Sequence, residues 1–236
     1  MKRILTLIIL CAAAIAAQAQ AKGYECTYQE KMDISQHLSK IDPSMRDAVA
    51  EFMTKRKSYY TLTFADGKSY YEKNKQISDD DFGMDAAPAY FVDFDKQEQT
   101  TVNNFFGRTF LINEPFKPAE WTFVNETRTI AGMNCSKAIH TDTATTIEVW
   151  YSSQTPIPAG PGSCYGLPGL VVEVTVGPLT YTLTEIKSLD QAPNIKKPTK
   201  GKKVTQEEYL EIVKKKLEEM GLGNFGNGVQ TFNIRL

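Results

Sequence analysis

Residues 58–71 read SYYTLTFADGKSYY and carry the clearest structural signal in the sequence. Polar and apolar side chains alternate over residues 58–64 with a period of two, which is typical of a β-strand with one buried face. Asp66 and Gly67 follow, and this dipeptide tolerates the positive φ angles that a two-residue turn between antiparallel strands requires. The stretch therefore predicts a β-hairpin whose second strand begins near Ser69.

The rest of the chain contains many similar stretches, most of them separated by Gly, Pro, Asn or Asp. Gly177 and Pro178 predict another tight turn. We expect an α+β fold that is mainly β, with a curved, largely antiparallel sheet that is open like a half-barrel. The other predicted strands are residues 23–31, 89–94, 99–102, 108–112, 121–124, 127–131, 135–141, 145–152, 170–176 and 180–186.

Two amphipathic stretches predict helices that pack on this sheet. Asp42 and Pro43 are typical of a helix start, and residues 205–208 (TQEE) form a capping box ahead of a helix that ends at Gly221. The lysine-rich residues 196–203, between the last strand and the second helix, predict a solvent-exposed loop. The apolar stripes are Met45, Val49, Phe52 and Met53 in the first helix, and Tyr209, Leu210, Val213, Leu217 and Met220 in the second.

The composition excludes several classes of function. Lysine and arginine number 27 against 28 aspartates and glutamates, so no basic excess is available to hold nucleic acid. Two histidines and four cysteines leave few ligands for a metal or haem, and we expect neither a metal nor another cofactor. No nucleophile with a neighbouring base is visible, so no catalytic residue is assigned.

The first nineteen residues resemble a secretory signal. Lys2 and Arg3 precede an apolar run over residues 4–17, and Ala17-Gln18-Ala19 is a small-x-small cleavage site. We expect residues 1–19 to be removed and residues 20–236 to form a single β-rich domain that ends in an amphipathic helix. This apolar run is shorter than the roughly twenty residues that a membrane-spanning helix needs, and no other apolar run in the sequence reaches its length. The sequence therefore predicts an exported protein without a transmembrane segment, periplasmic or associated with the outer membrane.

Export affects the expected state of the cysteines, because oxidising compartments favour disulfides. Cys26, Cys135 and Cys164 remain after cleavage, so one bridge and one free thiol are expected. We favour a bridge between Cys135 and Cys164, since both flank stretches that are predicted to be neighbouring strands. The other two pairings, and three unpaired thiols, stay open as alternatives.

Residues 150–170 contain the most distinctive loop. Gly166 and Gly169 allow backbone angles that other residues avoid, and Pro168 restricts the turn between them, so the loop is expected to be rigid. Such a loop can plug the end of the core. It can also form a binding edge for a ligand or partner, and the residues of that edge would be Trp150, Tyr151, Tyr165, Leu167 and Leu170.

This loop carries a family resemblance. Residues 166–171 read GLPGLV, and the preceding pattern contains Trp121, residues 130–132, Cys135 and residues 150–151. The chain resembles the GLPGLI family of exported Bacteroidetes proteins over about fifty residues, with valine at the last position of the motif. The resemblance implies an envelope protein with a curved antiparallel sheet similar to lipoprotein-carrier folds, and it implies no established activity.

The leading functional hypothesis is a non-enzymatic cell-envelope binding or accessory protein. It would present an apolar sheet and the rigid Gly-Pro loop to a peptide, a lipid-like ligand or a membrane-protein partner. One alternative is a periplasmic hydrolase or peptidase that uses acidic residues such as Glu148 and Glu173, and another is a purely structural envelope protein. Thr143, in the sequence Asp-Thr-Ala, is a candidate for O-glycosylation by analogy with exported Bacteroidetes proteins.

Overall fold

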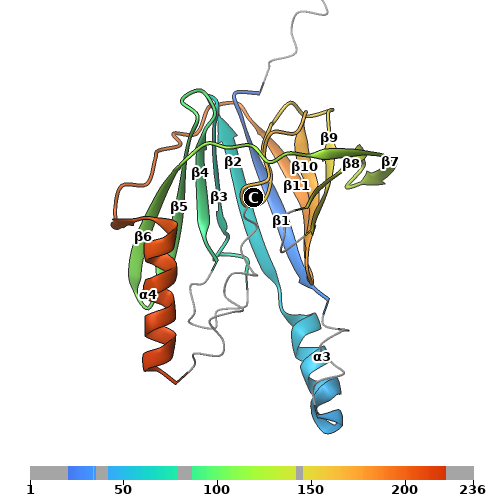
Figure 1. The fold of residues 1–236 in the computed structure, drawn as a ribbon. Helices are drawn as coiled ribbons and strands as arrows, with labels where there is room; N and C mark the ends of the chain where they lie inside the picture. Colours follow the sequence, from blue (N-terminus) through green and yellow to red (C-terminus); the bar gives the residue numbers. More distant parts are fainter. Residues whose placement is uncertain (1–20, 34, 36–41, 79–86, 142–145, 222–236) are drawn as a thin grey trace, which may run out of the picture.

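One open, curved sheet of twelve strands forms the body of the protein (Figure 1). This computed structural model describes residues 21–33, 35, 42–78, 87–141 and 146–221. The sheet and the two helices α3 and α4 confirm the mainly β, α+β fold and its half-barrel curvature. Within the described residues, no helix combines the length and the apolar character needed to span a bilayer.

The strands follow one another across the sheet with few crossovers, in the order β12-β6-β5-β4-β3-β2-β1-β11-β10-β9-β8-β7. All neighbours are antiparallel except β12 and β6, which are parallel. The strands are β1 (Gly23–Met32), β2 (Ser58–Ala65), β3 (Lys68–Lys73), β4 (Ala89–Asp93), β5 (Glu98–Phe105), β6 (Arg108–Pro115), β7 (Thr122–Ile130), β8 (Met133–Thr141), β9 (Thr146–Ser152), β10 (Leu170–Val176), β11 (Leu179–Leu189) and β12 (Lys202–Val204).

The predicted hairpin is confirmed in its residues and its turn. Asp66 and Gly67 have φ angles of 48° and 64°, which matches the positive values expected between β2 and β3. One prediction differs, because residues 121–124 and 127–131 form the single strand β7 rather than two strands. A register shift between Val124 and Thr127 lets the strand continue past the polar residues that had suggested a break.

Directly paired residues on neighbouring strands point to the same side of a sheet, so the register defines two faces. The inner face carries most of the core, including five tyrosines from adjacent strands: Tyr28, Tyr60, Tyr71, Tyr90 and Tyr181. Tyr28 donates its hydroxyl proton to the carbonyl oxygen of Val171 at 2.6 Å. The hydroxyl of Tyr71 is buried and has no hydrogen-bond partner in the described structure.

A charged pair lies next to the tyrosines. Tyr60 donates to Oε2 of Glu30 at 2.8 Å, and Nη2 of Arg56 lies 3.3 Å from Oε1 of the same carboxylate. The side chain of Glu30 is only 8% exposed. These bonds compensate the cost of burying the carboxylate, as buried charges require.

The two helices relate to the sheet differently. α4 (Gln206–Glu219) packs Tyr209, Val213 and Leu217 on Phe110 and Ile112 of the inner face of β6, as its apolar stripe predicts. Its capping box is confirmed, since the hydroxyl of the N-cap residue Thr205 accepts from the backbone N–H of Glu208 and the Glu208 carboxylate accepts from the backbone N–H of Thr205. The last residue of the predicted stripe, Met220, is instead the exposed C-cap residue.

The first predicted helix begins as a 3-10 turn, η1 (Pro43–Met45), and continues as α3 (Arg46–Lys55). Asp42 caps it by accepting from the backbone N–H of Ser44. α3 extends beyond the end of the sheet rather than covering a face (Figure 1), and Met45 is 57% exposed. The side chains of Val49, Phe52 and Met53 lie outside the described part of the chain.

Candidate binding groove on the outer face

A segment between β11 and β12 crosses the outer face of the sheet. We call residues 193–201 the strap. Pro193 packs so closely on Gly23 of β1 that a Cβ at this glycine would overlap the proline ring. At the other end, Gly201 lies against the carbonyl oxygen of Thr109 and the side chain of Leu111 in β6. The strap therefore spans the sheet from β1 to β6, and then continues as β12.

The solvent-exposed loop predicted for residues 196–203 is confirmed in part. All of its lysines are exposed, but Lys202–Val204 form β12 and pair in parallel with Phe110–Ile112. The strap covers one part of the outer face, and Leu111 there is only 1% exposed. An exposed lysine side chain is compatible with a strand at the edge of a sheet, which is how β12 accommodates its charges.

A groove lies between the strap and the hairpin, and the hairpin forms its floor. Thr63 of β2 and Tyr70 of β3 pair directly, so their side chains stand together on the outer face. Both are half-buried. Burial, followed by the negative charge of Glu72, raises the pKa of Tyr70 to about 12, and its hydroxyl is therefore protonated at neutral pH.

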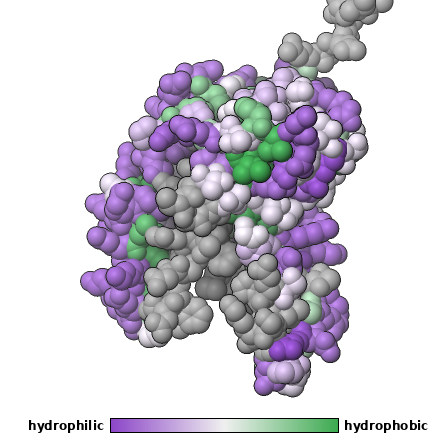
Figure 2. Space-filling view, turned by 45° about the vertical axis from the view of Figure 1, so that its right-hand side comes forward, coloured by the Kyte–Doolittle hydropathy of each residue, from purple (hydrophilic) through white to green (hydrophobic). Residues whose placement is uncertain are grey.

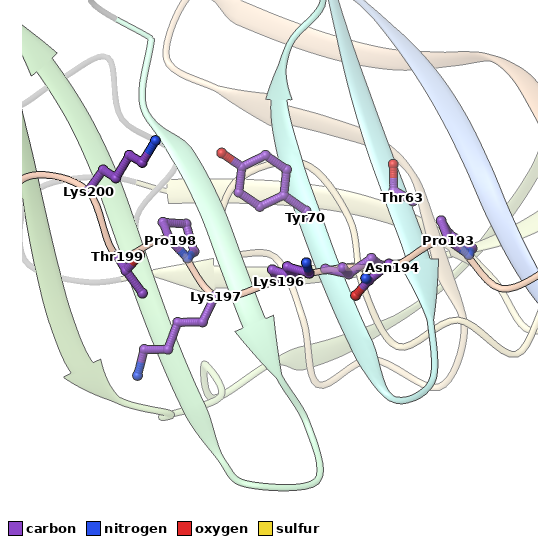
Figure 3. Close-up of a pocket in the computed structure, with 10 residues that line it drawn as sticks. Thr63, Tyr70, Pro193, Asn194, Lys196, Lys197, Pro198, Thr199 and Lys200 are labelled. Atoms are coloured by element: carbon purple, nitrogen blue, oxygen red, sulfur yellow. The ribbon is translucent and has the colours of Figure 1, made fainter.

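The strap forms the wall of this groove, as Figure 3 shows. Pro193, Ile195 and Pro198 are half-buried, whereas the polar residues between and after them are exposed. The groove has a volume of about 610 Å³. Its lining consists of Thr63, Tyr70, Pro193, Asn194, Ile195, Lys196, Lys197, Pro198, Thr199 and Lys200.

The charge of the groove is positive. Nζ of Lys197 lies 2.9 Å from Oε2 of Glu98, so this lysine is neutralised by the sheet. Lys196 and Lys200 have no ion-pair partner among the residues that the structure describes. Hydroxyl, amide, ammonium and aromatic groups line the groove, and this combination can hold a polar ligand that has one apolar surface.

The predicted binding edge is found mainly in the core. Trp150, Tyr165, Leu167 and Leu170 are between 0% and 6% exposed, and only Tyr151 is half-buried. These side chains therefore do not form the exposed apolar edge that the sequence suggested. The side of the molecule that carries β7, β8 and β9 is largely hydrophilic in Figure 2, with one compact hydrophobic patch.

The loop itself fills the inner side of the sheet. The ring of Tyr165 stacks on Phe116, and its hydroxyl donates to the side chain of Gln99 in β5, which lies far from β10 in the sheet. Trp121 donates from Nε1 to the backbone carbonyl of Tyr165 at 3.0 Å. Of the two interpretations offered for the loop, its burial favours the one in which it plugs the core.

The glycines of the loop adopt the backbone angles expected of them. Gly166 has a φ of 85° and Gly169 a φ of 145°. A Cβ at Gly169 would overlap the carbonyl group of Ser152, so this position needs glycine for space as well as for conformation. Pro168 lies in a tight turn that the backbone N–H of Gly169 closes by donating to the carbonyl oxygen of Leu167 at 2.9 Å.

The expected disulfide is absent. Cys26, Cys135 and Cys164 are all free and buried in the structure, which argues against the bridge between Cys135 and Cys164. Each thiol is instead part of the hydrophobic core. Burial, with a smaller contribution from the charge of Glu25, raises the pKa of Cys26 to about 12, and burial also raises the pKa of Cys164. Both therefore behave as small hydrophobic groups at neutral pH.

The acidic residues considered for catalysis are ion-paired. Glu173 pairs with Arg128, whose guanidinium also lies 4.0 Å from the ring centroid of Trp150. Glu148 pairs with Lys137 at 2.9 Å. These pairs lie on the outer face of β7 to β10, away from the groove residues. Each carboxylate therefore forms an ion pair with another side chain on the surface of the sheet. Thr143, the glycosylation candidate, lies outside the described residues.

Comparisons with known proteins assign the chain to a family. Residues 61–210 match the family model described as "N-glycanase peptide, N-terminal domain" (PNGase_F-II_N). The chain belongs to this family. The matched residues include most of the hairpin, the loop with the GLPGLV sequence and the whole strap. No curated protein matches the chain.

Solved structures that share the fold of this chain include two of PNGF-II. They are structures of PNGF-II in the C2 and P21 space groups, with TM-scores of 0.53 and 0.54 and sequence identities of 19% and 20%. Each alignment covers 82% of this chain and 33% of the solved chain, so the present chain spans a third of the length of PNGF-II. At this identity the similarity concerns the fold.

Proposed function

We propose that this protein is a non-enzymatic accessory domain that binds carbohydrate in the groove between the strap and the hairpin. The observation that carries the proposal is the half-buried ring of Tyr70, placed among hydroxyl and amide groups. Membership of a family named for an N-glycanase supports a sugar as the ligand, because an N-glycanase acts on glycans. The export signal predicted for residues 1–19 and the GLPGLI resemblance support a role in the cell envelope.

The groove suits a sugar for physical reasons. A pyranose ring has one face of C–H groups, and an aromatic ring is a large apolar surface on which such a face can pack. The sugar hydroxyls can donate to and accept from Thr63, Asn194 and Thr199 in the lining. The volume of about 610 Å³ lies within the range of ordinary small-ligand sites.

Binding has more support than the hydrolase alternative. Glycoside hydrolysis uses two carboxyl groups on either side of the bond that is cleaved. Glu148 and Glu173 are engaged with lysine and arginine instead, and they do not line the groove. A lipid-like ligand has also lost its support, because the apolar residues that would have received it are buried.

The proposal is tested by binding to an array of N-glycans and glycopeptides, followed by titration calorimetry with the strongest ligand. We expect Tyr70→Ala to weaken binding about tenfold, which corresponds to about 1.4 kcal/mol. Tyr59→Ala is the matched control, because Tyr59 is also half-buried on the outer face of β2 but does not line the groove. Equal effects of the two substitutions, or no bound glycan, would refute the proposal.

A further inference from the structure

We infer that the ligand of the groove is an acidic sugar, whose anionic group is held by Lys196 and Lys200 while its ring packs on Tyr70. This inference rests on the proposed function and adds the chemical class of the ligand. The whole chain carries a formal net charge of −1, so a positive groove is a local property and not a consequence of general basicity. The lining contains three lysines and no acidic residue.

The three lysines have different roles. Lys197 is bound to Glu98 at 2.9 Å, which attaches the middle of the strap to β5. In Figure 3 its side chain points away from Tyr70, whereas the side chain of Lys200 extends towards the tyrosine side of the strap. Lys196 and Lys200 therefore keep their charges available for a ligand, within the part of the chain that the structure describes.

The strap is well suited to hold these charges in place. Pro193 and Pro198 restrict its backbone, and the N–H of Ile195 donates to the carbonyl oxygen of Pro193 at 3.0 Å. Its two ends are packed on Gly23 and against β6. A wall that is already ordered loses little conformational entropy on binding. Even a modest attraction between the two lysines and an anionic ligand therefore increases the affinity.

The expected gain is moderate because both lysines are exposed. Exposed ion pairs contribute little individually, and two such pairs together correspond to about a tenfold change in affinity. The gain should decrease as salt is added, since screening acts strongly on exposed charges. Packing on Tyr70 is an independent contribution, which allows the two parts of the site to be tested separately.

The test uses matched sets of oligosaccharides that differ at one position: a neutral hexose, the corresponding hexuronic acid and the 6-O-sulfated hexose. Binding is measured for the unmodified protein, for a Lys196→Gln/Lys200→Gln variant and for a Lys202→Gln/Lys203→Gln control. The control removes the same charge from exposed lysines of β12, outside the groove. Tyr70→Ala is measured in parallel.

We expect the acidic members to bind about tenfold more tightly than the neutral one at low salt. The groove variant should lose this preference and the control should keep it. A preference for the hexuronic acid identifies a carboxylate as the ligand group, and a preference for the sulfated sugar identifies a sulfate; both support the inference.

The opposite outcomes separate the inference from the proposed function. If neutral and acidic sugars bind equally and Tyr70→Ala weakens both, the inference is wrong and the carbohydrate-binding function stands. If acidic sugars bind but neither the groove lysines nor Tyr70 affect them, both proposals are wrong. The absence of binding to every set also overturns both.

Discussion

Two neighbouring tyrosines in the core should respond to the same substitution with opposite signs. Tyr28 and Tyr71 contact each other edge to face, with their ring centroids 6.3 Å apart, and both are almost fully buried. The hydroxyl of Tyr28 donates to the carbonyl oxygen of Val171, whereas that of Tyr71 has no partner in the described structure. Replacing each tyrosine by phenylalanine removes one hydroxyl and leaves the ring.

The expected magnitudes follow from this difference. A buried hydrogen bond contributes about 1 kcal/mol net, so Tyr28→Phe should lower the free energy of unfolding by about 1 to 2 kcal/mol. An unpaired buried hydroxyl carries a desolvation cost of about 1 to 3 kcal/mol, so Tyr71→Phe should raise the free energy of unfolding by at least about 1 kcal/mol. The two variants should therefore differ by roughly 2 to 4 kcal/mol.

Urea denaturation followed by tryptophan fluorescence measures both values, and equal m-values confirm that the comparison is valid. In thermal unfolding, each kcal/mol should shift the Tm by about 2 to 4 °C for a chain of this size. The reasoning is refuted if Tyr71→Phe is as destabilising as Tyr28→Phe, because the hydroxyl of Tyr71 would then have a bonding partner.

Three further predictions concern the loop, the helix α4 and the buried thiols. Gly169→Ala should destabilise the protein by several kcal/mol, because the added Cβ would overlap the carbonyl group of Ser152. Gly177 also has a positive φ but lies in open space, so Gly177→Ala should cost only about 1 to 2 kcal/mol. Similar urea midpoints for the two variants would contradict the role of close packing at Gly169. Thr205→Ala should cost about 1 kcal/mol through loss of the capping box, and an unchanged Tm would show that α4 does not depend on its cap. The pKa of Cys26 is raised from 9.0 to about 12, so between these pH values the folded state keeps a proton that the unfolded chain loses. The contribution of the buried thiol to stability is therefore complete below pH 9 and is lost as the pH rises towards 12. We expect a lower urea midpoint at pH 10 than at pH 8, and equal midpoints would contradict the raised pKa.

The sequence was sufficient for most of the sheet because local rules determine its strands. The period of two and the Asp66-Gly67 turn predicted the central hairpin to within two residues at each end. The capping box at Thr205 predicted the start of α4 for the same reason, since its hydrogen bonds join residues three positions apart. Such features depend little on the rest of the fold.

The groove could not be predicted in this way. Its floor comes from Thr63 and Tyr70, and its wall from residues 193–200, so it exists only because the strap crosses one face of the sheet. Nothing in the local pattern of residues 196–203 states which face is crossed. Residues 196–203 contain five lysines, but a charge run has the same composition in a loop and in the wall of a binding site.

The loop shows a different difficulty. Glycine and proline correctly indicated unusual backbone angles, but apolar side chains such as Leu167 and Leu170 are equally suited to a core and to a binding edge. Burial decides between these, and burial depends on the curvature of the whole sheet. The cysteines are similar, because the preference for disulfides describes a compartment and not the distance between two particular thiols.

The position of β1 has a consequence for how the protein reaches its native state. β1 is the first strand in the described part of the chain, yet it lies in the middle of the sheet between β2 and β11. The hydroxyl of Thr184 donates to the carbonyl oxygen of Thr27 across 157 positions of sequence. During synthesis, the meander β2 to β6 can assemble from near neighbours, but the seam between β1 and β11 must wait until the residues of β11, Leu179–Leu189, have been made. This high contact order predicts slow folding, with the joining of the two sheet halves as the late step.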